Sequence, residues 1–290
     1  MEKLDFVDSH IHLYDMQHPH LTYGHWAPNF IHPVLGAQIQ VLGERNFIAE
    51  DYLEITKDAN VTKAIHVQAA IGSEDPVKET EWLQEASDRT GFPHGIVAFA
   101  DFSARDIQET LERHCVFENM RGIRDFEAAD HFEAPSFKQG FGLMERYDLI
   151  ASMGVEWMQM SQLKSVASEF PGVKMVLDHT GTPLKRDDEY VEGWRRGISS
   201  LGEVDNLWCK ISGLGMGDHE WTTERIRSFV MHCIETFGTD RCFFGTNWPV
   251  DSLWSSYDSI VDAYAEIVSD FSDQERQSLF STNAENLYRI

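Results

Sequence analysis

The chain has 290 residues, of which 42% are hydrophobic and 25% are charged, and its formal net charge is −24. This composition is ordinary for a globular protein, and the length suits one large α/β domain or two small ones. The acidic balance argues against nucleic acids and anionic membranes as partners, because both attract cationic surfaces. Its simplest interpretation is solubility through self-repulsion.

The sequence also bears on compartment and partners. No apolar run approaches the ~20 residues that a membrane-spanning helix needs, and Met1–Asp5 lacks the apolar segment of a signal peptide. The cysteines Cys115, Cys209, Cys233 and Cys242 form no C-x-x-C pair, as expected of buried thiols in a reducing compartment. We therefore expect a cytoplasmic protein whose partner is a small-molecule substrate. A homo-oligomer is compatible with the sequence.

Short apolar runs that predict strands alternate with amphipathic segments that predict helices. The predicted strands are Phe6–His10, Lys63–Gln68, Gly95–Ala100, Met120–Arg124, Gly154–Gln159, Lys174–His179, Leu207–Ile211 and Cys242–Gly245. The predicted helices are Ala49–Ala59, Pro76–Thr90, Ala104–His114, Phe137–Met153, Ser161–Phe170, Asp187–Leu201, Thr222–Phe237, Tyr257–Val268 and Ser272–Tyr288. Eight strand-then-helix units favour one (β/α)8 TIM-barrel domain over residues 1–290, with a doubly wound sheet as the alternative.

The segment Tyr14–Asn46 breaks this alternation, because it shows no clear period. Structureless loops of this length are usually functional or disordered, and aromatic residues such as Tyr23, Trp26 and Phe30 argue against disorder. We predict that this long loop covers the C-terminal mouth of the barrel. The alternative is a surface excursion that packs without touching a ligand.

The end of the first predicted strand carries two histidines, His10 and His12. Side chains two residues apart in a strand point to the same face, so both imidazoles are expected to converge, with Asp8 on the same side. Converging neutral imidazoles can hold Zn²⁺ or grip the oxygens of a substrate. The alternative is a strand end that faces water.

Further polar residues follow the other strands, at the barrel end where catalytic groups lie in this fold. They are His66, Gln68, Asp101, Arg124, Asp125, Gln159, Gln162, Asp178, His179, Lys210, Ser212, Asn247 and Asp251. We expect His66 to be a core histidine and Lys210 to pair with an acid inside the barrel. Asp178 is expected to face away from His179. Together with the first two histidines, His179 completes a set of three imidazoles where one metal ion could sit.

Four motifs carry a family resemblance: Asp8–Asp15, Arg121–Arg124, Leu177–Pro183 and Phe244–Val250. Through them the chain resembles the amidohydrolase superfamily, specifically its lactonase-like branch of metal-dependent TIM-barrel hydrolases. This branch includes sugar lactonases and 2-pyrone-4,6-dicarboxylate lactonase. The similarity covers essentially the whole chain and is more specific for the family than for a substrate.

The resemblance implies that His10, His12 and His179 bind a metal ion or polarise a substrate carbonyl, and that Arg124 meets a substrate carboxylate or hydroxyl. It also implies an acid after strand eight as the general base, but Asn247 occupies that position and an amide cannot accept a proton from water. The chain also lacks the strand-five histidine of many metal-binding members and a strand-four lysine for a binuclear site. One Zn²⁺ and metal-independent action therefore both remain open.

The leading hypothesis is hydrolysis of a small lactone, or of a related C–O or C–N bond, by attack of water. His10, His12 and His179 would polarise the carbonyl, and Asn247 would orient substrate or water. The base would be Asp251, Asp125 or a metal-bound hydroxide, although Asp251 could instead cap its loop or pair with Arg124.

The candidate substrate-binding residues are Gln68, Arg124, Gln162, Trp26 and Trp248. An aromatic cover suits a ring-shaped or partly apolar ligand, although the same residues could simply pack. Two other functions remain open at this point. One is a non-hydrolytic decarboxylase or lactone isomerase on the same barrel, which needs no hydrolytic base at Asn247. The other is a non-catalytic small-molecule-binding homologue.

Overall fold

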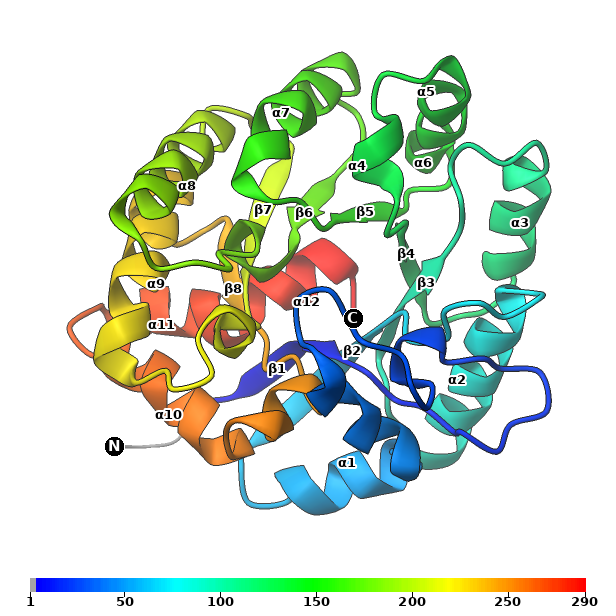
Figure 1. Ribbon diagram of the computed structural model, residues 1–290, viewed down its shortest axis with the longest axis horizontal. Coiled ribbons are helices and arrows are strands. Elements are labelled where there is room, and N and C mark those ends of the chain that lie inside the picture. The colour runs from blue at the N-terminus through cyan, green and yellow to red at the C-terminus, as the bar shows by residue number, and fades with distance from the viewer. Residues whose placement is uncertain (1–3) are drawn as a thin grey trace.

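The computed structural model describes residues 4–290, so Met1–Lys3 of the N-terminal segment considered above lie outside the described residues. Eight parallel strands pair in chain order around a barrel (Figure 1). They are β1 (Phe6–Ile11), β2 (Val61–Val67), β3 (Gly95–Phe99), β4 (Met120–Arg124), β5 (Ile150–Met153), β6 (Met175–Leu177), β7 (Leu207–Ile211) and β8 (Cys242–Phe244). The predicted (β/α)8 barrel is therefore confirmed.

Helices surround the strands as an outer ring, except for α12, which lies across one end of the barrel (Figure 1). They are α1 (Ala49–Thr56), α2 (Val77–Thr90), α3 (Ile107–His114), α4 (Ala128–His131), α5 (Pro135–Phe141), α6 (Leu143–Arg146), α7 (Met160–Glu169), α8 (Asp188–Leu201), α9 (Thr223–Phe237), α10 (Tyr257–Ile267), α11 (Asp273–Gln277) and α12 (Asn283–Tyr288). Within residues 4–290, none of these helices is long and apolar enough to cross a membrane.

The barrel closes through the residues that follow β8 rather than through β8 itself. The backbone N–H of His12 donates to the carbonyl of Trp248 at 2.7 Å, and the N–H of Asn247 donates to the carbonyl of His10 at 2.9 Å. An isolated parallel bridge also joins Ile11 to Trp248. The segments at the ends of β1 and β8, which carry candidate catalytic residues, are thus fixed against each other by the closure of the barrel.

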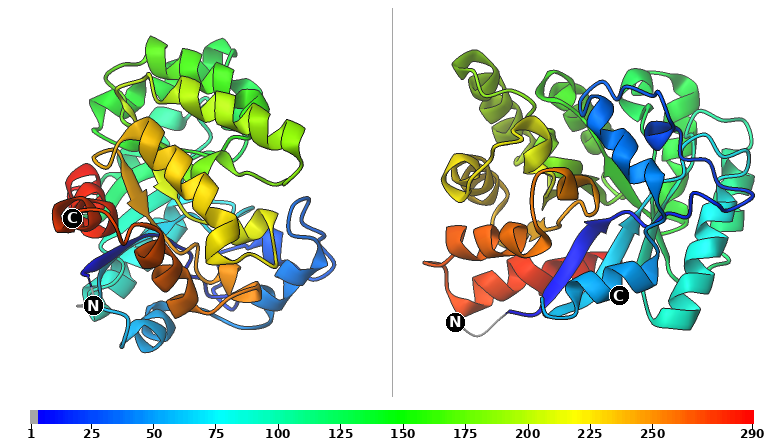
Figure 2. Two further views of the ribbon diagram at one scale, coloured as in Figure 1. Left: turned by 90° about the vertical axis from the view of Figure 1, so that its left-hand side faces the viewer. Right: turned by 60° about the horizontal axis from the view of Figure 1, so that its bottom comes forward.

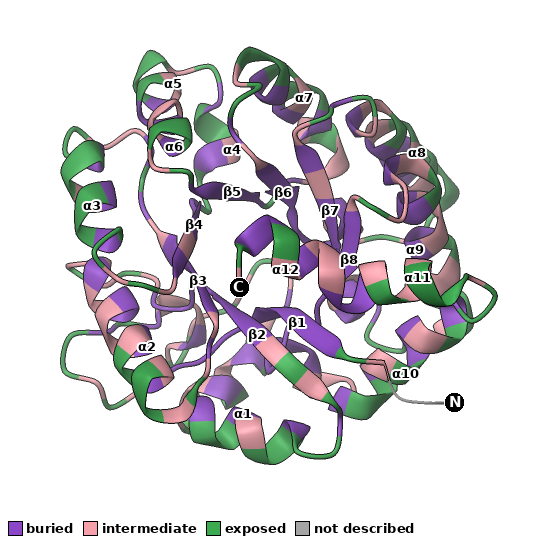
Figure 3. Cartoon of the chain, turned by 180° about the vertical axis from the view of Figure 1, so that it is seen from behind, coloured by how far each residue is buried: buried purple, intermediate pink, exposed green. Residues whose placement is uncertain are grey.

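The barrel interior is a packed apolar core at the N-terminal ends of the strands. Its buried residues come from the inward faces of the strands and from α12, namely Val7, Ile65, Val67, Val97, Ile150, Val176, Phe243, Ala284, Leu287 and Tyr288. The view from behind shows α12 lying across the centre of that end (Figure 3). Because α12 closes this end, the C-terminal ends of the strands form the accessible mouth.

The prediction for the fifth strand is wrong. Ile150–Met153 forms β5, although the sequence pattern placed it in a helix over Phe137–Met153. A short strand that is buried on both faces shows a continuous apolar run, which cannot be told from a buried helix turn by periodicity. The break comes at Asp148, whose φ of 49° lies in the left-handed region and ends the helical segment. The predicted strand Gly154–Gln159 is a loop ending in a 3₁₀ turn.

The loop after β1, residues 14–46, covers the mouth as predicted, and we call it the lid. Its base is closed by a backbone pair between Tyr14 and Phe47, with N···O distances of 2.7 and 2.9 Å. The ring of Trp26 lies 4.2 Å from that of Tyr14 and stacks on Tyr23 at 5.5 Å between centroids. The left view of Figure 2 shows the lid and the C-terminal helices at opposite ends of the barrel.

Candidate active site

The strand-one histidines owe their orientation to an irregularity in β1. The pairing register between β1 and β2 shifts between Asp8 and Ile11, so the simple alternation of faces is interrupted. Asp8 accepts hydrogen bonds from the hydroxyls of Tyr52 at 3.1 Å and Tyr257 at 2.9 Å, on helices α1 and α10. The expectation that Asp8 would share a side with His10 is therefore wrong, because Asp8 faces the helices outside the barrel.

His12 has a tautomer that its neighbours fix. Its Nδ1 lies 2.8 Å from the carbonyl oxygen of Val67, which only accepts, so Nδ1 carries the proton and Nε2 presents a lone pair. This lone pair faces Nε2 of His10 at 3.2 Å and Oδ1 of Asn247 at 3.3 Å. The Asn247 amide is held in this orientation because its Nδ2 donates to Asp251 at 2.7 Å.

These contacts define which groups could hold a metal ion. Burial lowers the pKa of His10 and of His12 well below its ordinary value, so both rings are neutral at pH 7. Three possible metal-ligand atoms then lie together: Nε2 of His12, Nε2 of His10 and Oδ1 of Asn247. They carry at most one proton between them, so this set of ligand atoms fits a divalent cation. The set has no anionic ligand. Among residues 4–290, no group of three or more His, Cys, Asp or Glu side chains is arranged to hold a metal ion.

His179 lies beside this pair but is held separately. Its ring centroid is 4.4 Å from that of His10 in a tilted arrangement, and its Nδ1 lies 2.9 Å from the hydroxyl of Ser212. The backbone of His179 has a φ of 53°, in the left-handed region that non-glycine residues rarely adopt. Burial lowers its pKa to about 3, so this ring is also neutral. The three predicted histidines are therefore close together, although His179 does not complete a three-histidine metal set.

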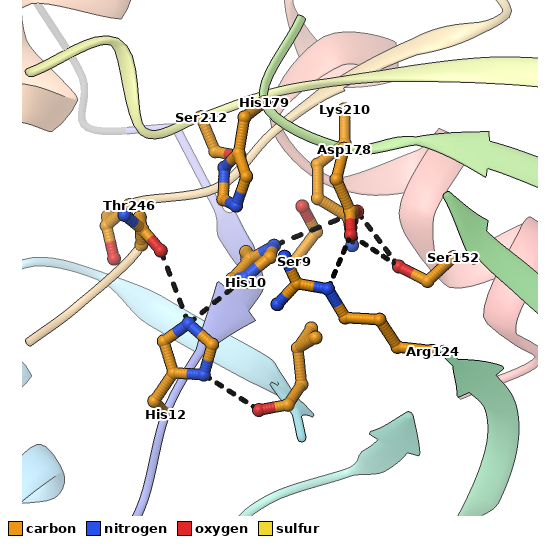
Figure 4. Close-up of polar contacts among 12 residues, drawn as sticks. Ser9, His10, His12, Arg124, Ser152, Asp178, His179, Lys210, Ser212 and Thr246 are labelled. Carbon is orange, nitrogen blue, oxygen red and sulfur yellow. Dashed lines mark hydrogen bonds and ion pairs between the residues drawn. The ribbon is translucent and has the colours of Figure 1, made fainter. Parts of the chain in front are cut away.

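A buried charge cluster lies next to the histidines (Figure 4). The carboxylate of Asp178 accepts from Ser152 at 2.8 and 2.9 Å and from Lys210 at 3.1 Å, and it pairs with Nε of Arg124 at 3.3 Å. These two cations hold the pKa of Asp178 well below its ordinary value, although burial alone would raise it. Lys210 pairs with an acid as predicted. Asp178 points into the barrel, two residues after the inward-facing Val176, and the left-handed turn that follows brings His179 to the same side. The expectation that Asp178 faces away from His179 is therefore wrong.

The space above these groups is a cavity of about 450 Å³ between the barrel and the lid. Its lining includes His12, His179 and Asn247. Of the predicted substrate-binding residues, Trp26, Gln68 and Arg124 line it. The guanidinium of Arg124 lies 4.0 Å above the ring of Phe126, another lining residue, which fixes its position at the cavity wall.

Two predicted substrate-binding residues lie elsewhere. Gln162 is on the exposed face of α7. It was expected just after strand five, but that strand is the earlier segment Ile150–Met153, so Gln162 lies within the following helix and not at the mouth. Trp248 is 7% exposed and packs its ring against Tyr257 at 5.5 Å, away from the residues that line the cavity. Its backbone closes the barrel instead. A role in contacting substrate therefore has no support from the position of either residue.

The two acids considered as general bases do not line the cavity either. Asp125 accepts from the backbone N–H of Phe102 and of Glu127, both at 3.1 Å, so it shapes the loop after β4. Asp251 lies behind Asn247 and holds its amide. Asp251 does not pair with Arg124, whose ionic partner is Asp178.

His66 is a core histidine, as expected. Its Nδ1 accepts from the backbone N–H of Leu13 at 3.0 Å, and its Nε2 lies 3.3 Å from the buried carboxylate of Glu79. Glu79 also accepts from the N–H groups of Ala69 and Ala70, both at 2.8 Å. This network fixes the chain immediately after His12 and after β2.

The sequence did not single out two groups that the structure brings to the site. Ser152 was missed because its strand was assigned to a helix, although a serine within an apolar run is a recognisable signal. His25 and His32 were seen only as part of the lid, yet both line the cavity. The signal that could have found them is the presence of histidines in an aromatic-rich cover loop.

The comparisons with known proteins agree with this architecture. A family model described as amidohydrolase matches residues 7–290. The chain belongs to the amidohydrolase family. It is 35% identical over 302 residues to the uncharacterized protein y4mH of Sinorhizobium fredii, with both chains fully covered. The family membership makes this chain an enzyme of the hydrolase class.

More distant relatives of this amidohydrolase have described activities or structures. An L-fucono-1,5-lactonase of Burkholderia ambifaria is 25% identical over 300 residues, which cover 98% of this chain and 95% of the relative. A solved amidohydrolase structure from Burkholderia multivorans, with bound Zn, has a TM-score of 0.83 at 23% identity, covering 98% and 99% of the two chains. The solved structure shows a shared fold.

The burial of Asp251 leads to a testable pH effect on stability. Burial raises the pKa of its carboxyl to about 7 from an ordinary value of 3.8. A carboxyl whose pKa rises on folding stabilises the folded state while protonated, and this contribution is lost as the pH rises from about 4 to about 7. In the variant Asp251→Asn the side chain stays neutral and can still accept from Asn247. We therefore expect the variant to lose less stability than the wild type over this window.

Urea unfolding of both proteins at several pH values between 4 and 8 measures this difference, since all other groups titrate alike in the two chains. The free energy of unfolding of the variant, minus that of the wild type, should increase as the pH rises from about 4 to about 7. A pH-independent difference would show that Asp251 does not change its pKa on folding.

Proposed function

We propose that this amidohydrolase opens a small, uncharged, hydroxylated lactone by attack of water on the ring carbonyl. The observation that carries the proposal is the cavity of about 450 Å³, whose lining combines neutral imidazoles with an apolar and aromatic cover. A cavity of this size suits a single small ring. The L-fucono-1,5-lactonase relative supports a sugar lactone as the substrate class.

The charges around the cavity support an uncharged substrate. Among the described residues that line it, Arg124 is the one permanently cationic side chain, and Glu127, Asp130 and Glu156 are acidic. Arg124 is already paired with Asp178. A dicarboxylate would meet three carboxylates against one partly neutralised guanidinium, which disfavours its binding. Hydroxyl groups can donate to carboxylates and accept from Arg124 without such a penalty.

The residues can be given chemical roles from their geometry. The tautomer of His12 is fixed, so its ring presents a lone pair on Nε2. This nitrogen would accept a proton from the attacking water. His179 and Arg124 line the same cavity and would donate hydrogen bonds to the carbonyl and to substrate hydroxyls. Asn247 would orient the attacking water through Oδ1, which lies beside Nε2 of His12, rather than act as a base, since its amide has no basic site at neutral pH.

The same acceptor set fits a metal ion. His10 Nε2, His12 Nε2 and Asn247 Oδ1 would hold a divalent cation such as Zn²⁺, which would supply Lewis-acid polarisation of the ester carbonyl. The solved structure of the Burkholderia multivorans relative contains Zn. Because none of these three donors is anionic, we expect a Zn²⁺ affinity below that of sites with a carboxylate or thiolate ligand.

The decisive experiment measures hydrolysis of L-fucono-1,5-lactone and of 2-pyrone-4,6-dicarboxylate in H₂¹⁸O. We expect turnover of the sugar lactone with one ¹⁸O in the acid product, and at least tenfold lower kcat/KM for the dicarboxylate. Release of CO₂ or an unlabelled isomer would instead favour a decarboxylase or an isomerase. Preference for the dicarboxylate would overturn the proposed substrate class.

A second measurement separates the two ways of activating water. Zinc content is determined in the purified enzyme, and activity is compared before and after dialysis against a chelator. Activity that is lost on chelation and returns with Zn²⁺ assigns the activation to the cation. Activity that persists without metal assigns it to the lone pair of His12.

A further inference from the structure

The tip of the lid forms a small hairpin that faces the cavity. The backbones of His32 and Gly36 exchange two hydrogen bonds, with N···O distances of 3.2 and 2.8 Å. Gly36 adopts a φ of 65°, which a glycine tolerates without strain. His32, Pro33, Val34 and Leu35 of this hairpin, His32–Gly36, all line the cavity. In Figure 1 the blue segments of the lid lie over the mouth of the barrel.

The hairpin fixes the tautomer of His32. Nδ1 of this ring accepts from the backbone N–H of Val34 at 3.1 Å and from that of Leu35 at 3.2 Å. A nitrogen that accepts from two N–H groups cannot carry a proton, so the proton of the neutral ring is on Nε2. Burial also lowers the pKa of His32, which keeps the ring neutral at pH 7. His32 therefore presents a hydrogen-bond donor, and not an acceptor or a cation.

This donor is not used by the protein itself. Among the described residues, none forms a hydrogen bond with Nε2 of His32, and that atom is not sealed from solvent. The ring is held in place by aromatic contacts: its centroid lies 5.1 Å from that of His25, which stacks on Phe30 at 5.5 Å. A rigid ring with one free donor at the wall of a substrate cavity is suited to bind an oxygen acceptor of the ligand.

We propose that His32 is a specificity-determining residue that donates from Nε2 to a hydroxyl oxygen of the lactone, so that the lid selects hydroxylated rings over bare ones. This inference rests on the proposed lactonase function. It assigns the lid a direct part in binding, in addition to covering the mouth. The resulting selectivity is a difference in binding, because the donor is left unpaired when the ring has no hydroxyl at that position.

Two substitutions of His32 separate the donor from the hairpin contacts. In His32→Asn the short amide oxygen can replace Nδ1 as the acceptor for Val34 and Leu35, but no atom reaches the position of Nε2. In His32→Gln the longer amide can place an N–H near the position of Nε2, but the hairpin loses its acceptor. The substrates are L-fucono-1,5-lactone and δ-valerolactone, which has the same ring without hydroxyls.

If Nε2 binds substrate, His32→Asn should raise KM for the fuconolactone about tenfold, as expected for one lost hydrogen bond to a neutral acceptor. The change for δ-valerolactone should be at least five times smaller, and His32→Gln should recover part of the loss. Imidazole ¹⁵N NMR of the wild type should show protonated Nε2 and unprotonated Nδ1. Equal effects on both lactones, or normal kinetics in His32→Asn, would overturn the proposal and leave His32 a hairpin residue.

The test also distinguishes failure of the proposed function. If the wild type hydrolyses neither lactone, the lactonase proposal fails, and binding decides the role of His32. The probe is then 1,5-anhydro-D-glucitol, a hydroxylated ring without an ester, titrated calorimetrically into wild type and His32→Asn. Weaker binding by the variant supports the donor role, whereas equal binding or none in both proteins overturns it.

Discussion

Replacing His179 by asparagine should lower kcat/KM for lactone hydrolysis by about 10²–10³, the usual effect of removing one donor to a developing oxyanion. Asparagine is the suitable replacement because it tolerates the left-handed backbone that His179 adopts at a φ of 53°. Its amide also keeps a polar group near Nδ1, which lies 2.9 Å from the hydroxyl of Ser212. The substitution thus removes Nε2 and leaves the local fold in place.

The measurement is a steady-state comparison of both proteins, with circular dichroism to confirm that the variant is folded. A matched control is His114→Asn, which changes another buried histidine that contacts Thr80 and Phe99 on the far side of β3 from the cavity. The control should keep kcat/KM within about threefold at temperatures where it is folded. Near-normal kinetics in His179→Asn would remove His179 from the reaction.

The fold was largely predictable from the sequence, because the repeated alternation of apolar and amphipathic segments reports directly on a barrel. The exception shows the limit of that signal. Ile150–Met153 is buried on both faces, so its apolar run continues the helical pattern before it, and only the left-handed Asp148 separates the two. A single-residue break in backbone conformation leaves little trace in the pattern of polar and apolar residues.

The candidate site was predictable in its members more than in its arrangement. Converging histidines were expected from the i, i+2 spacing of His10 and His12. The register shift between Asp8 and Ile11, which puts His10 on a different face from Asp8, depends on pairing with β2 and could not be read from β1 alone. Likewise, the left-handed turn at His179 brings its side chain to the same side as that of Asp178, against the alternation that a regular strand would impose. Both departures come from backbone geometry near the mouth.

The buried cluster around Asp178 should be important for stability as well as for holding Arg124. Substituting Lys210 by methionine, which has a similar length and no charge, is expected to cost about 3–5 kcal/mol of unfolding free energy. Lys210 is fully buried and donates to Asp178 at 3.1 Å, so its loss leaves a buried carboxylate with Arg124 as its remaining cation. Urea unfolding monitored by circular dichroism measures the change.

The double variant Lys210→Met/Asp178→Asn tests the physical reason for that loss. If the cost of the single substitution is an unpaired buried charge, removing the charge on Asp178 as well should recover part of it. The amide oxygen of the new side chain could still accept from Ser152, which in the wild type donates to the carboxylate oxygens at 2.8 and 2.9 Å. The two changes should therefore couple by about 1–3 kcal/mol, in the range found for residues in one network. Additive costs would mean that the packing of the Lys210 chain, rather than its charge, stabilises the barrel.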